Sequence, residues 1–320
     1  MSGQHPVERG RIVADRPPLR GAAARARQAR SLWRARRWFA DPQRYAAGAA
    51  LTDEIAARLL ARVDCARLAP RVVLDLGAGS GRALDALSRR FPRAALLALD
   101  ASEAMLAGAP ADWRWWRRPL RAAADAQCLP LADASVDLLF SNLMLPWCAD
   151  LPLALAEMRR VLRPGGALFL STLGPGCLTA LDALGAADAR LMRLAWPLPD
   201  LRELTDLLAA GGFGDAVGDV ERLRVSYARR ETLAEDLLAL GLAALAARDA
   251  WLDVRCGGAA RRASPQPLQL PLEVLFVHAW RAPGELPAAT GAGGAQPLRQ
   301  WPKLPGHGLG AGFVDGLGKD

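Results

Sequence analysis

The sequence predicts an α/β fold built on a doubly wound sheet, which carries helices on both faces. Three stretches support this prediction. Residues 72–90 have the pattern of a buried strand, a glycine-rich turn and a helix. Residues 94–106 repeat a strand and a helix, and residues 135–162 do so again. Strands that alternate with helices along a chain form a largely parallel sheet, and such a sheet is covered on both faces.

The glycine-rich turn has the spacing G-x-G-x-G at Gly77, Gly79 and Gly81. Glycine lets the backbone turn sharply and approach a ligand, and the helix that follows directs free N–H groups to the same place. A dinucleotide motif would need a glycine where the chain has Arg82. Asp75, two residues before the first glycine, would repel a pyrophosphate and would suit a cationic ligand. A tight turn without a ligand is the alternative.

Length and composition limit the possible classes of protein. The 320 residues suffice for one large domain with additions or for two small ones, and 52% of them are hydrophobic. No run of 18 apolar residues is free of charges, so we expect no membrane span. The five cysteines are scattered and there are only three histidines. This argues against a disulfide framework and a metal site, and it fits a reducing cytoplasm.

The positive charge is concentrated near the N-terminus. Residues 1–44 contain eleven arginines and three acids, which accounts for the whole net charge of +8. An Arg-rich start also resembles a transit peptide, but Pro17 and Pro18 interrupt the amphipathic helix that such a peptide needs. We expect a disordered, solvated tail over residues 1–30 rather than a nucleic-acid-binding segment. The Gly- and Pro-rich residues 283–320 predict a second disordered tail.

A helical segment is expected before the first strand. Residues 31–45 are amphipathic and aromatic, and apolar residues recur at helical spacing over 51–63. After the glycine loop and its helix, the second strand covers residues 94–99 and ends at Asp100. An acid about 20 residues after a glycine loop is placed to accept hydrogen bonds from ribose hydroxyls. Its alternative role is to cap the helix over residues 102–106.

The sequence indicates some of the later strands more clearly than others. Residues 112–121 alternate tryptophan and arginine, which favours an edge strand with arginine stacked on indole over a surface for RNA. The fourth strand, over residues 135–142, ends at Asn142, where a doubly wound sheet presents side chains to a ligand. A helix over residues 152–162 and a fifth strand over residues 167–170 follow.

Two further stretches carry recognisable motifs. Residues 125–130 read D-A-x-x-L-P, and residues 161–166 read V-L-R-P-G-G. Together with the acid and the glycines of the first loop, they resemble the class I S-adenosylmethionine (SAM)-dependent methyltransferases. The resemblance implies a Rossmann-like seven-stranded sheet, with its last strands near residues 220–227 and 272–280. It also implies SAM as the methyl donor, whose ammonium and sulfonium groups suit the acid at Asp75.

A narrower resemblance lies on the side of the methyl acceptor. Residues 141–151 read S-N-L-M-L-P-W-C-A-D-L, and residues 171–178 read S-T-L-G-P-G-C-L. Both resemble the malonyl-acyl-carrier-protein O-methyltransferases of biotin synthesis, and the methyltransferase domain with its acceptor-side lid is expected over residues 31–282. Pro146 and Cys177 stand where that family has glutamine and threonine. These departures affect the acceptor side and leave the SAM side intact.

The resemblance implies two groups of binding residues. For the cofactor it implies Asp75, Gly77, Ala78, Gly79, Gly81, Asp100, Ala101, Asp125, Ala126 and Asn142. For the substrate it implies Tyr45 and Trp147, although Trp147 in an apolar wall is hard to distinguish from a core residue. Asp125 would accept a hydrogen bond from the adenine amine, unless it serves only the turn. No metal is implied.

The implied reaction needs no general base. A free carboxylate is ionised at neutral pH, so the work of the protein is to position the reactants and to exclude water. No evident base is present, His278 is interpreted as structural, and we name no catalytic residue. The expected partner is an acyl carrier protein or a CoA thioester. Exposed arginines would steer an acidic carrier protein, unless they form an ordinary solvated face: Arg229, Arg230, Arg261 and Arg262.

Two other functions stay open on the sequence. One is methyl transfer to another small molecule, with the same donor site and a different lid. The other is a non-methylating protein that resembles the complex I assembly factors associated with arginine hydroxylation of a partner. In each case we expect a cytoplasmic monomer that binds neither nucleic acid nor a membrane.

Overall fold

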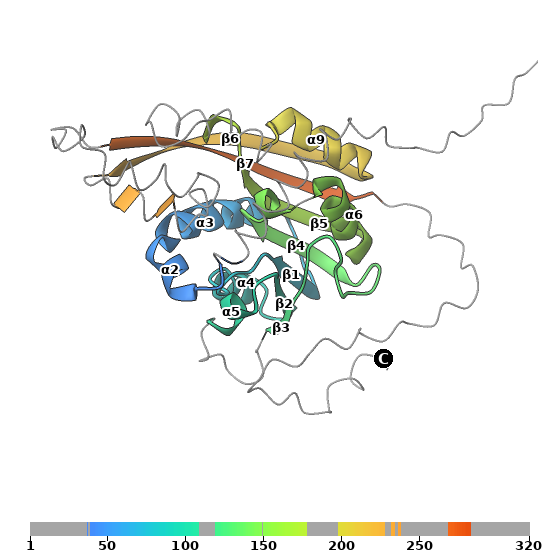
Figure 1. Ribbon diagram of the computed structural model, residues 1–320. Coiled ribbons are helices and arrows are strands. Elements are labelled where there is room, and N and C mark those ends of the chain that lie inside the picture. Colours follow the sequence, from blue (N-terminus) through green and yellow to red (C-terminus); the bar gives the residue numbers. More distant parts are fainter. Residues whose placement is uncertain are drawn as a thin grey trace, which may run out of the picture.

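The computed structural model describes residues 37, 39–108, 119–148, 150–177, 198–227, 232–233, 236–237 and 268–282 (Figure 1). The two expected tails lie outside these ranges. So do residues 112–118 of the Trp- and Arg-rich stretch and the four arginines expected to steer a carrier protein.

A seven-stranded sheet forms the centre of the molecule (Figure 1). Its order is β3-β2-β1-β4-β5-β7-β6. The strands are β1 (Val72–Leu76), β2 (Ala95–Asp100), β3 (Leu120–Ala123), β4 (Val136–Asn142), β5 (Leu162–Leu173), β6 (Phe213–Tyr227) and β7 (Leu268–Arg281). Strands β1 to β5 are parallel, whereas β7 runs antiparallel to both β5 and β6. The predicted seven-stranded sheet is confirmed.

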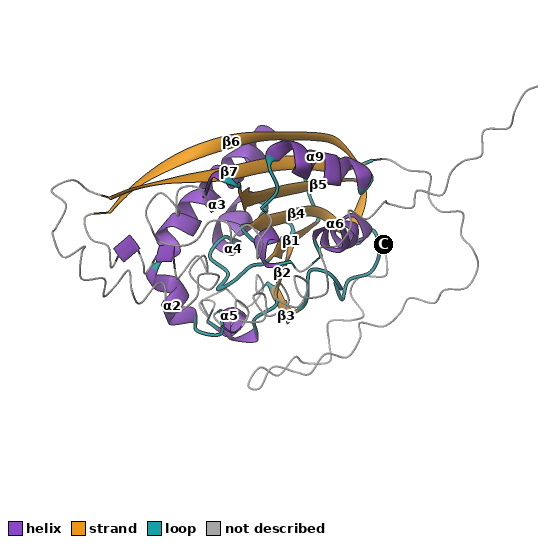
Figure 2. Ribbon diagram, turned by 45° about the horizontal axis from the view of Figure 1, so that its top comes forward, coloured by secondary structure: helices purple, strands orange, loops and turns teal. Residues whose placement is uncertain are grey.

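Helices cover both faces of this sheet (Figure 2). The helices are α2 (Pro42–Ala47), α3 (Ala49–Cys65), α4 (Leu84–Arg90), α5 (Glu103–Ala107), α6 (Leu151–Val161) and α9 (Leu201–Ala210), with a 3-10 turn η2 (Leu145–Trp147). Helices α3 and α4 share one hydrophobic cluster with the sheet, and α6 and α9 share another. The sheet is therefore doubly wound, as predicted.

The two clusters follow from the alternation of side chains along each strand. In β4, Leu138 and Phe140 pack into the α3 cluster, whereas Leu139 packs into the α6 cluster. All three are fully buried. Strands covered on both faces need apolar residues at successive positions, which explains the continuous apolar runs in the sequence.

The order of the strands places a crevice at their carboxyl ends. Strand β1 lies between β2 and β4, so the connections that leave β1 and β4 pass to opposite sides of the sheet. In sheets of this kind the ligand site lies outside the carboxyl ends at such a switch point. The glycine loop after β1, Asp100 at the end of β2 and Asn142 at the end of β4 all belong to this edge.

Several elements differ from the sequence predictions, and among them β5 and β7 begin earlier than expected, at Leu162 and Leu268. The third strand covers only Leu120–Ala123 within the described residues, and β6 begins at Phe213 rather than near residue 220. Helix α9 was not predicted at all. Its start carries a capping box in which Asp200 accepts from the Glu203 N–H at 2.8 Å and Glu203 accepts from the Asp200 N–H at 3.0 Å. The spacing D-x-x-E was the sequence signal for it.

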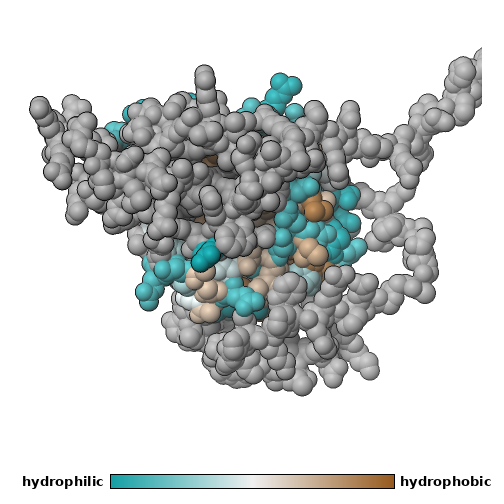
Figure 3. Space-filling model, in the orientation of Figure 1, coloured by the Kyte–Doolittle hydropathy of each residue, from teal (hydrophilic) through white to brown (hydrophobic). Residues whose placement is uncertain are grey.

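The described surface shows no large apolar area on the side of Figure 3. Hydrophilic residues predominate around α6, with isolated hydrophobic residues among them. No helix in the described ranges is both long enough and apolar enough to cross a membrane.

We expect Phe140→Ala to lower the free energy of unfolding by about 3–5 kcal/mol, because its ring is 0% exposed and its removal leaves a cavity between α3 and β4. Urea unfolding measures this loss. The matched control is Leu153→Ala on α6, whose residue is 47% exposed and whose replacement should change stability by about 0.5 kcal/mol or less. Similar losses in the two variants would contradict the burial of Phe140.

Candidate functional site

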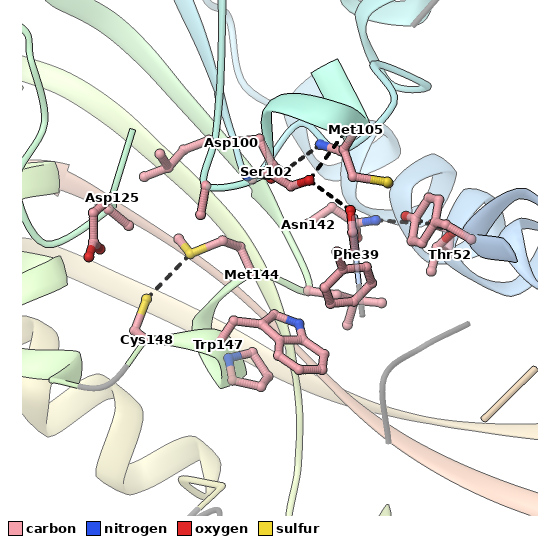
Figure 4. Close-up of a pocket in the computed structure, with 18 of the residues that line it drawn as sticks. Phe39, Thr52, Asp100, Ser102, Met105, Asp125, Asn142, Met144, Trp147 and Cys148 are labelled. Carbon is pink, nitrogen blue, oxygen red and sulfur yellow. Dashed lines mark hydrogen bonds between the residues drawn. The ribbon is translucent and has the colours of Figure 1, made fainter. Parts of the chain in front are cut away.

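An open pocket lies at the carboxyl ends of β1, β2 and β4 and contains about 990 Å³ of empty space, part of it open to solvent (Figure 4). A concave site lined mainly by apolar residues with a few polar groups is typical of small-molecule binding. Most of the predicted site residues line it: Tyr45, Gly77, Gly79, Asp100, Ala101, Asp125, Ala126, Asn142 and Trp147. Asp75, Ala78 and Gly81 do not line it, although they belong to the strand and loop that form its floor.

The glycine loop adopts backbone conformations that disfavour other residues. Gly77, Gly79 and Gly81 have φ angles of 78°, 55° and 74°. At Gly77 there is also no room for a side chain, because a Cβ atom would lie 2.5 Å from Cγ of Met144. The Gly81 N–H donates to the Ala78 carbonyl at 2.8 Å, so Gly81 shapes the turn rather than the wall of the pocket.

The carboxylate of Asp100 holds two parts of the pocket together. Its Oδ2 accepts from the Gly79 N–H and its Oδ1 from the Ser102 N–H, each at 2.8 Å. Burial raises the pKa of Asp100, and the backbone hydrogen bonds oppose that effect. The cap of α5 is Ser102, whose Oγ accepts from the Met105 N–H. Asp100 is thus not the helix cap, and its remaining lone pairs are compatible with ribose hydroxyls.

Asp75 is an acid buried under the glycine loop. It is 2% exposed, and its Oδ2 atom has no hydrogen-bond partner in the described part of the chain. Burial, and then the nearby charge of Asp100, raise the pKa of Asp75 to about 8. A buried acid without a partner is costly, and a cationic group bound nearby would lower this cost.

Asp125 is oriented by its neighbour Gln127. Its Oδ1 accepts from both the backbone N–H and the side-chain Nε2 of Gln127, each at 3.0 Å. The Gln127 Oε1 in turn accepts from the Asp150 N–H at 2.7 Å, at the start of α6. Asp125 therefore occupies a defined position in the lining of the pocket, where an acceptor for an amine is expected.

An aromatic group closes one side of the pocket (Figure 4). The Phe39 ring meets Trp147 edge-on with centroids 4.7 Å apart, and Tyr45 at 5.8 Å. Ser102 holds this segment in place, because its Oγ donates to the Phe39 carbonyl at 2.7 Å. Tyr45 and Trp147 thus line the same pocket as the cofactor residues, and Phe39 joins them.

Asn142 lines the pocket, but both ends of its side-chain amide are engaged by the protein. Its Nδ2 donates to the Thr52 carbonyl at 3.0 Å, and its Oδ1 accepts from the Ser171 hydroxyl at 2.7 Å. Asn142 therefore lies at the pocket, as the sequence predicted. The two polar atoms of its side chain, however, hydrogen-bond to α3 and β5.

Several lining residues were not predicted from the sequence. They are mostly apolar, and they lie in stretches that the sequence analysis had considered without assigning these residues to a site: Phe39, Met105, Met144 and Leu173. The aromatic stretch around residue 39 was the only signal for Phe39. Among the described residues, those that line the pocket include no His, Lys or Arg, and His278 lies on β7, stacked on Phe169 at 5.4 Å.

Comparison with known proteins identifies the family. The chain is 41% identical over 209 residues to the malonyl-[acyl-carrier protein] O-methyltransferase of Halorhodospira halophila, a match that covers 64% of this chain and 70% of that protein. The chain belongs to this family. The corresponding protein of Xylella fastidiosa is 38% identical over 251 residues, covering 75% of this chain and 84% of that protein.

Two further comparisons agree with this family. The methyltransferase domain pattern matches residues 74–170, from β1 to β5. The crystal structure of the YcgJ protein from Bacillus subtilis superimposes with a TM-score of 0.52 at 19% identity, covering 71% of this chain and 99% of that one, so the two share the fold. The protein is a SAM-dependent methyltransferase.

The pocket residues fit SAM as the methyl donor. The unpartnered Oδ2 of Asp75 suits a cationic ligand, the loop at Gly79 leaves no Cβ atom against the ligand, and the acids at the ends of β2 and β3 suit hydroxyls and an amine. When bound, SAM supplies an electrophilic methyl group on a sulfonium.

We expect Gly77→Ala to be more damaging than Gly165→Ala. Both positions have a positive φ, 78° and 76°, but only Gly77 lacks room for a Cβ atom. Gly165→Ala should cost about 1–2 kcal/mol from backbone strain, and Gly77→Ala a further 1–3 kcal/mol or so from the clash with Met144. Urea unfolding and calorimetric SAM titration measure both effects. Equal stability and equal SAM affinity in the two variants would contradict the close packing at Gly77.

Asp75 predicts an unusual dependence of stability on pH. Its folded-state pKa of about 8 lies above the ordinary value near 3.9, so between these pH values the folded protein retains a proton that the unfolded chain has lost. Stability should therefore fall as the pH rises from about 4 to about 8. Asp75→Asn should remove most of this fall, raise stability at pH 8 and weaken SAM binding about tenfold or more.

Urea unfolding at pH 5.5 and pH 8 tests this expectation. The matched control is Asp85→Asn, an acid on α4 that pairs with Arg89 at the surface. An identical pH profile in wild type and Asp75→Asn would show that Asp75 is already ionised in the folded protein.

Proposed function

We propose that this protein transfers the methyl group of SAM to the free carboxylate of a malonyl thioester on an acyl carrier protein. The observation that carries the proposal is the 41% identity to a relative whose name states this reaction. The pocket supports it as well, because the described lining places the acids Asp100 and Asp125 beside an aromatic group formed by Phe39, Tyr45 and Trp147.

The donor half would be held by groups from three strand ends. We infer that Asp100 binds the ribose, that Asp125 accepts from the adenine amine, and that the glycine loop carries the methionine end above Asp75. Ala101 and Ala126 follow the two acids and line the same wall, so their small side chains leave room for the nucleoside. Ala78 and Gly81 contribute through the shape of the loop.

The acceptor half would lie between the glycine loop and the aromatic group. A carboxylate acceptor is already ionised at neutral pH, so its oxygen attacks the methyl carbon without a proton transfer. This agrees with the part of the lining that the structure describes, where no histidine is found. The role of the protein is then to align the two reactants and to exclude water. Phe39, Tyr45 and Trp147 would exclude water, because they form an apolar wall.

We place the catalytic domain at residues 31–282 and infer that it acts in the cytoplasm, where its carrier protein would be found. The carrier protein is a large and acidic partner, so its docking would involve surface beyond the pocket itself. The experiment that follows therefore tests which molecule accepts the methyl group.

The experiment is methyl transfer from labelled SAM to three acceptors, namely malonyl-carrier protein, malonyl-CoA and carrier protein without malonate. We expect base-labile label on the malonyl thioesters alone, because a methyl ester is hydrolysed by base. Asp100→Ala should reduce transfer by about 100-fold or more, since it removes the contacts that hold both the glycine loop and Ser102. The matched control is Asp206→Ala, a surface acid on α9 that should keep full activity.

Other outcomes would redirect the proposal. Transfer to a different small molecule would retain the enzyme and replace the acceptor. Calorimetric binding of SAM without transfer to any acceptor would favour a non-methylating relative.

A further inference from the structure

A chain of hydrogen bonds runs along the wall of the pocket from β5 to the N-terminal helices, and Figure 4 labels two of its members, Asn142 and Thr52. The Ser171 hydroxyl donates to Oδ1 of Asn142 at 2.7 Å, and Nδ2 of Asn142 donates to the Thr52 carbonyl at 3.0 Å. The Tyr45 hydroxyl then reaches the Thr52 hydroxyl at 3.4 Å. One side-chain amide thus connects the ends of β4 and β5 to the first turn of α3.

Burial limits how this chain can rearrange. Ser171 is 0% exposed and Thr52 is 5% exposed, so neither can exchange its partners freely for water. The Ser171 hydroxyl also accepts from the Leu143 N–H at 3.1 Å. Leu143 has a φ of 55°, which is uncommon for a residue with a side chain, and this contact helps to hold it there. The end of β4 is therefore fixed on both sides of Asn142.

The direction of the last hydrogen bond is determined by the threonine. A hydroxyl has one proton to donate, and that of Thr52 goes to the Ala49 carbonyl at 2.8 Å. Toward Tyr45, the Thr52 oxygen can therefore only accept, so the Tyr45 hydroxyl must donate. The Tyr45 ring lies 3.9 Å from the Cβ position of Gly79, directly beside the glycine loop.

We propose that Asn142 is a positioning residue that acts through Thr52 on Tyr45, rather than a residue that offers its amide to the ligand. Ser171 fixes the amide, the amide fixes the first turn of α3, and Thr52 sets the place and hydrogen-bond direction of the Tyr45 hydroxyl. The inference rests on the proposed function only in treating Tyr45 as part of the acceptor wall.

The composition of the chain allows a direct measurement. It contains only two tyrosines, Tyr45 and Tyr227, so biosynthetic incorporation of 3-fluorotyrosine gives two ¹⁹F resonances. A Tyr227→Phe variant of the full chain assigns the signal of Tyr45. Spectra are recorded at neutral pH without any ligand, so they do not depend on the identity of the methyl acceptor.

We expect the Tyr45 resonance to move toward that of free fluorotyrosine, and to broaden, in Ser171→Ala, Asn142→Ala and Thr52→Val. In the described part of the structure neither Ser171 nor Asn142 hydrogen-bonds to Tyr45, so a shift in their variants reports transmission through Thr52. Thr52→Ser retains the hydroxyl and should restore the wild-type resonance. Thr205→Val is the matched control, because the Thr205 hydroxyl bonds only to carbonyls of α9.

Kinetics complete the test. Asn142→Ala and Thr52→Val should lower kcat/KM for methyl transfer by about the same factor, 10-fold or more, and their double variant should lose little beyond either single variant. An unchanged Tyr45 resonance in ligand-free Asn142→Ala, with SAM affinity reduced tenfold, would overturn the proposal and make Asn142 a direct ligand contact. If Asn142→Ala fails to fold, Ser171→Ala and Thr52→Val decide the same question.

Failure of the proposed reaction would look different. If the malonyl thioesters accept no methyl group, the ¹⁹F shifts would still report whether Asn142 positions Tyr45. If the ¹⁹F shifts are absent while methyl transfer is normal, the reaction stands and the positioning role is wrong.

Discussion

Two hydrogen bonds to a single, partly buried carboxylate hold the pocket in shape. Asp100 accepts from the backbone of Gly79 in one loop and of Ser102 in the next. Ser102 then caps α5 and holds the carbonyl of Phe39. The glycine loop, the helix after β2 and the aromatic segment before α2 thus depend on one acid. A carboxylate suits this role because it can accept several N–H groups at once.

The same arrangement is electrostatically expensive without a ligand. Asp75 and Asp100 are neighbouring acids, and the charge of Asp100 disfavours ionisation of Asp75. Asp100 is partly compensated by backbone N–H groups, whereas the Oδ2 of Asp75 has no partner among the described residues. A cationic cofactor supplies the missing compensation. The donor site is therefore formed at some cost to the stability of the protein, as is usual where a site is built to bind charge.

The sequence correctly predicted those elements whose residue pattern fits only one kind of structure. The apolar run before Gly77, the acid that ends β2 and the D-A-x-x-L-P motif place Asp100 and Asp125 correctly at one edge of the sheet. The sequence did not predict the start of β6, because Gly214, Asp215 and Gly218 are typical of turns. Gly218 packs closely against the helix that was missed, since a Cβ atom there would lie 2.6 Å from Cδ1 of Leu201.

Contacts within the pocket were less predictable than its location. The motif places Asn142 at the end of β4, but only the fold brings Thr52 and Ser171 to its two ends. Met144 is an ordinary apolar residue in the sequence, and it fills the space that a side chain at Gly77 would need. Such contacts join segments far apart along the chain, so no local pattern reports them.

The position of β7 has a consequence for synthesis of the chain. This strand is the last in sequence, yet it lies inside the sheet, between β5 and β6. While the polypeptide emerges from the ribosome, β5 ends at Leu173 and stays without its second neighbour until residues 268–281 appear. From Ala167 to Leu173 every residue of β5 is buried in the finished sheet and most are apolar, so the nascent chain exposes an unpaired, largely apolar strand edge during that interval. Completion of the sheet is thus a late event of translation, and truncated products of this gene would aggregate rather than fold.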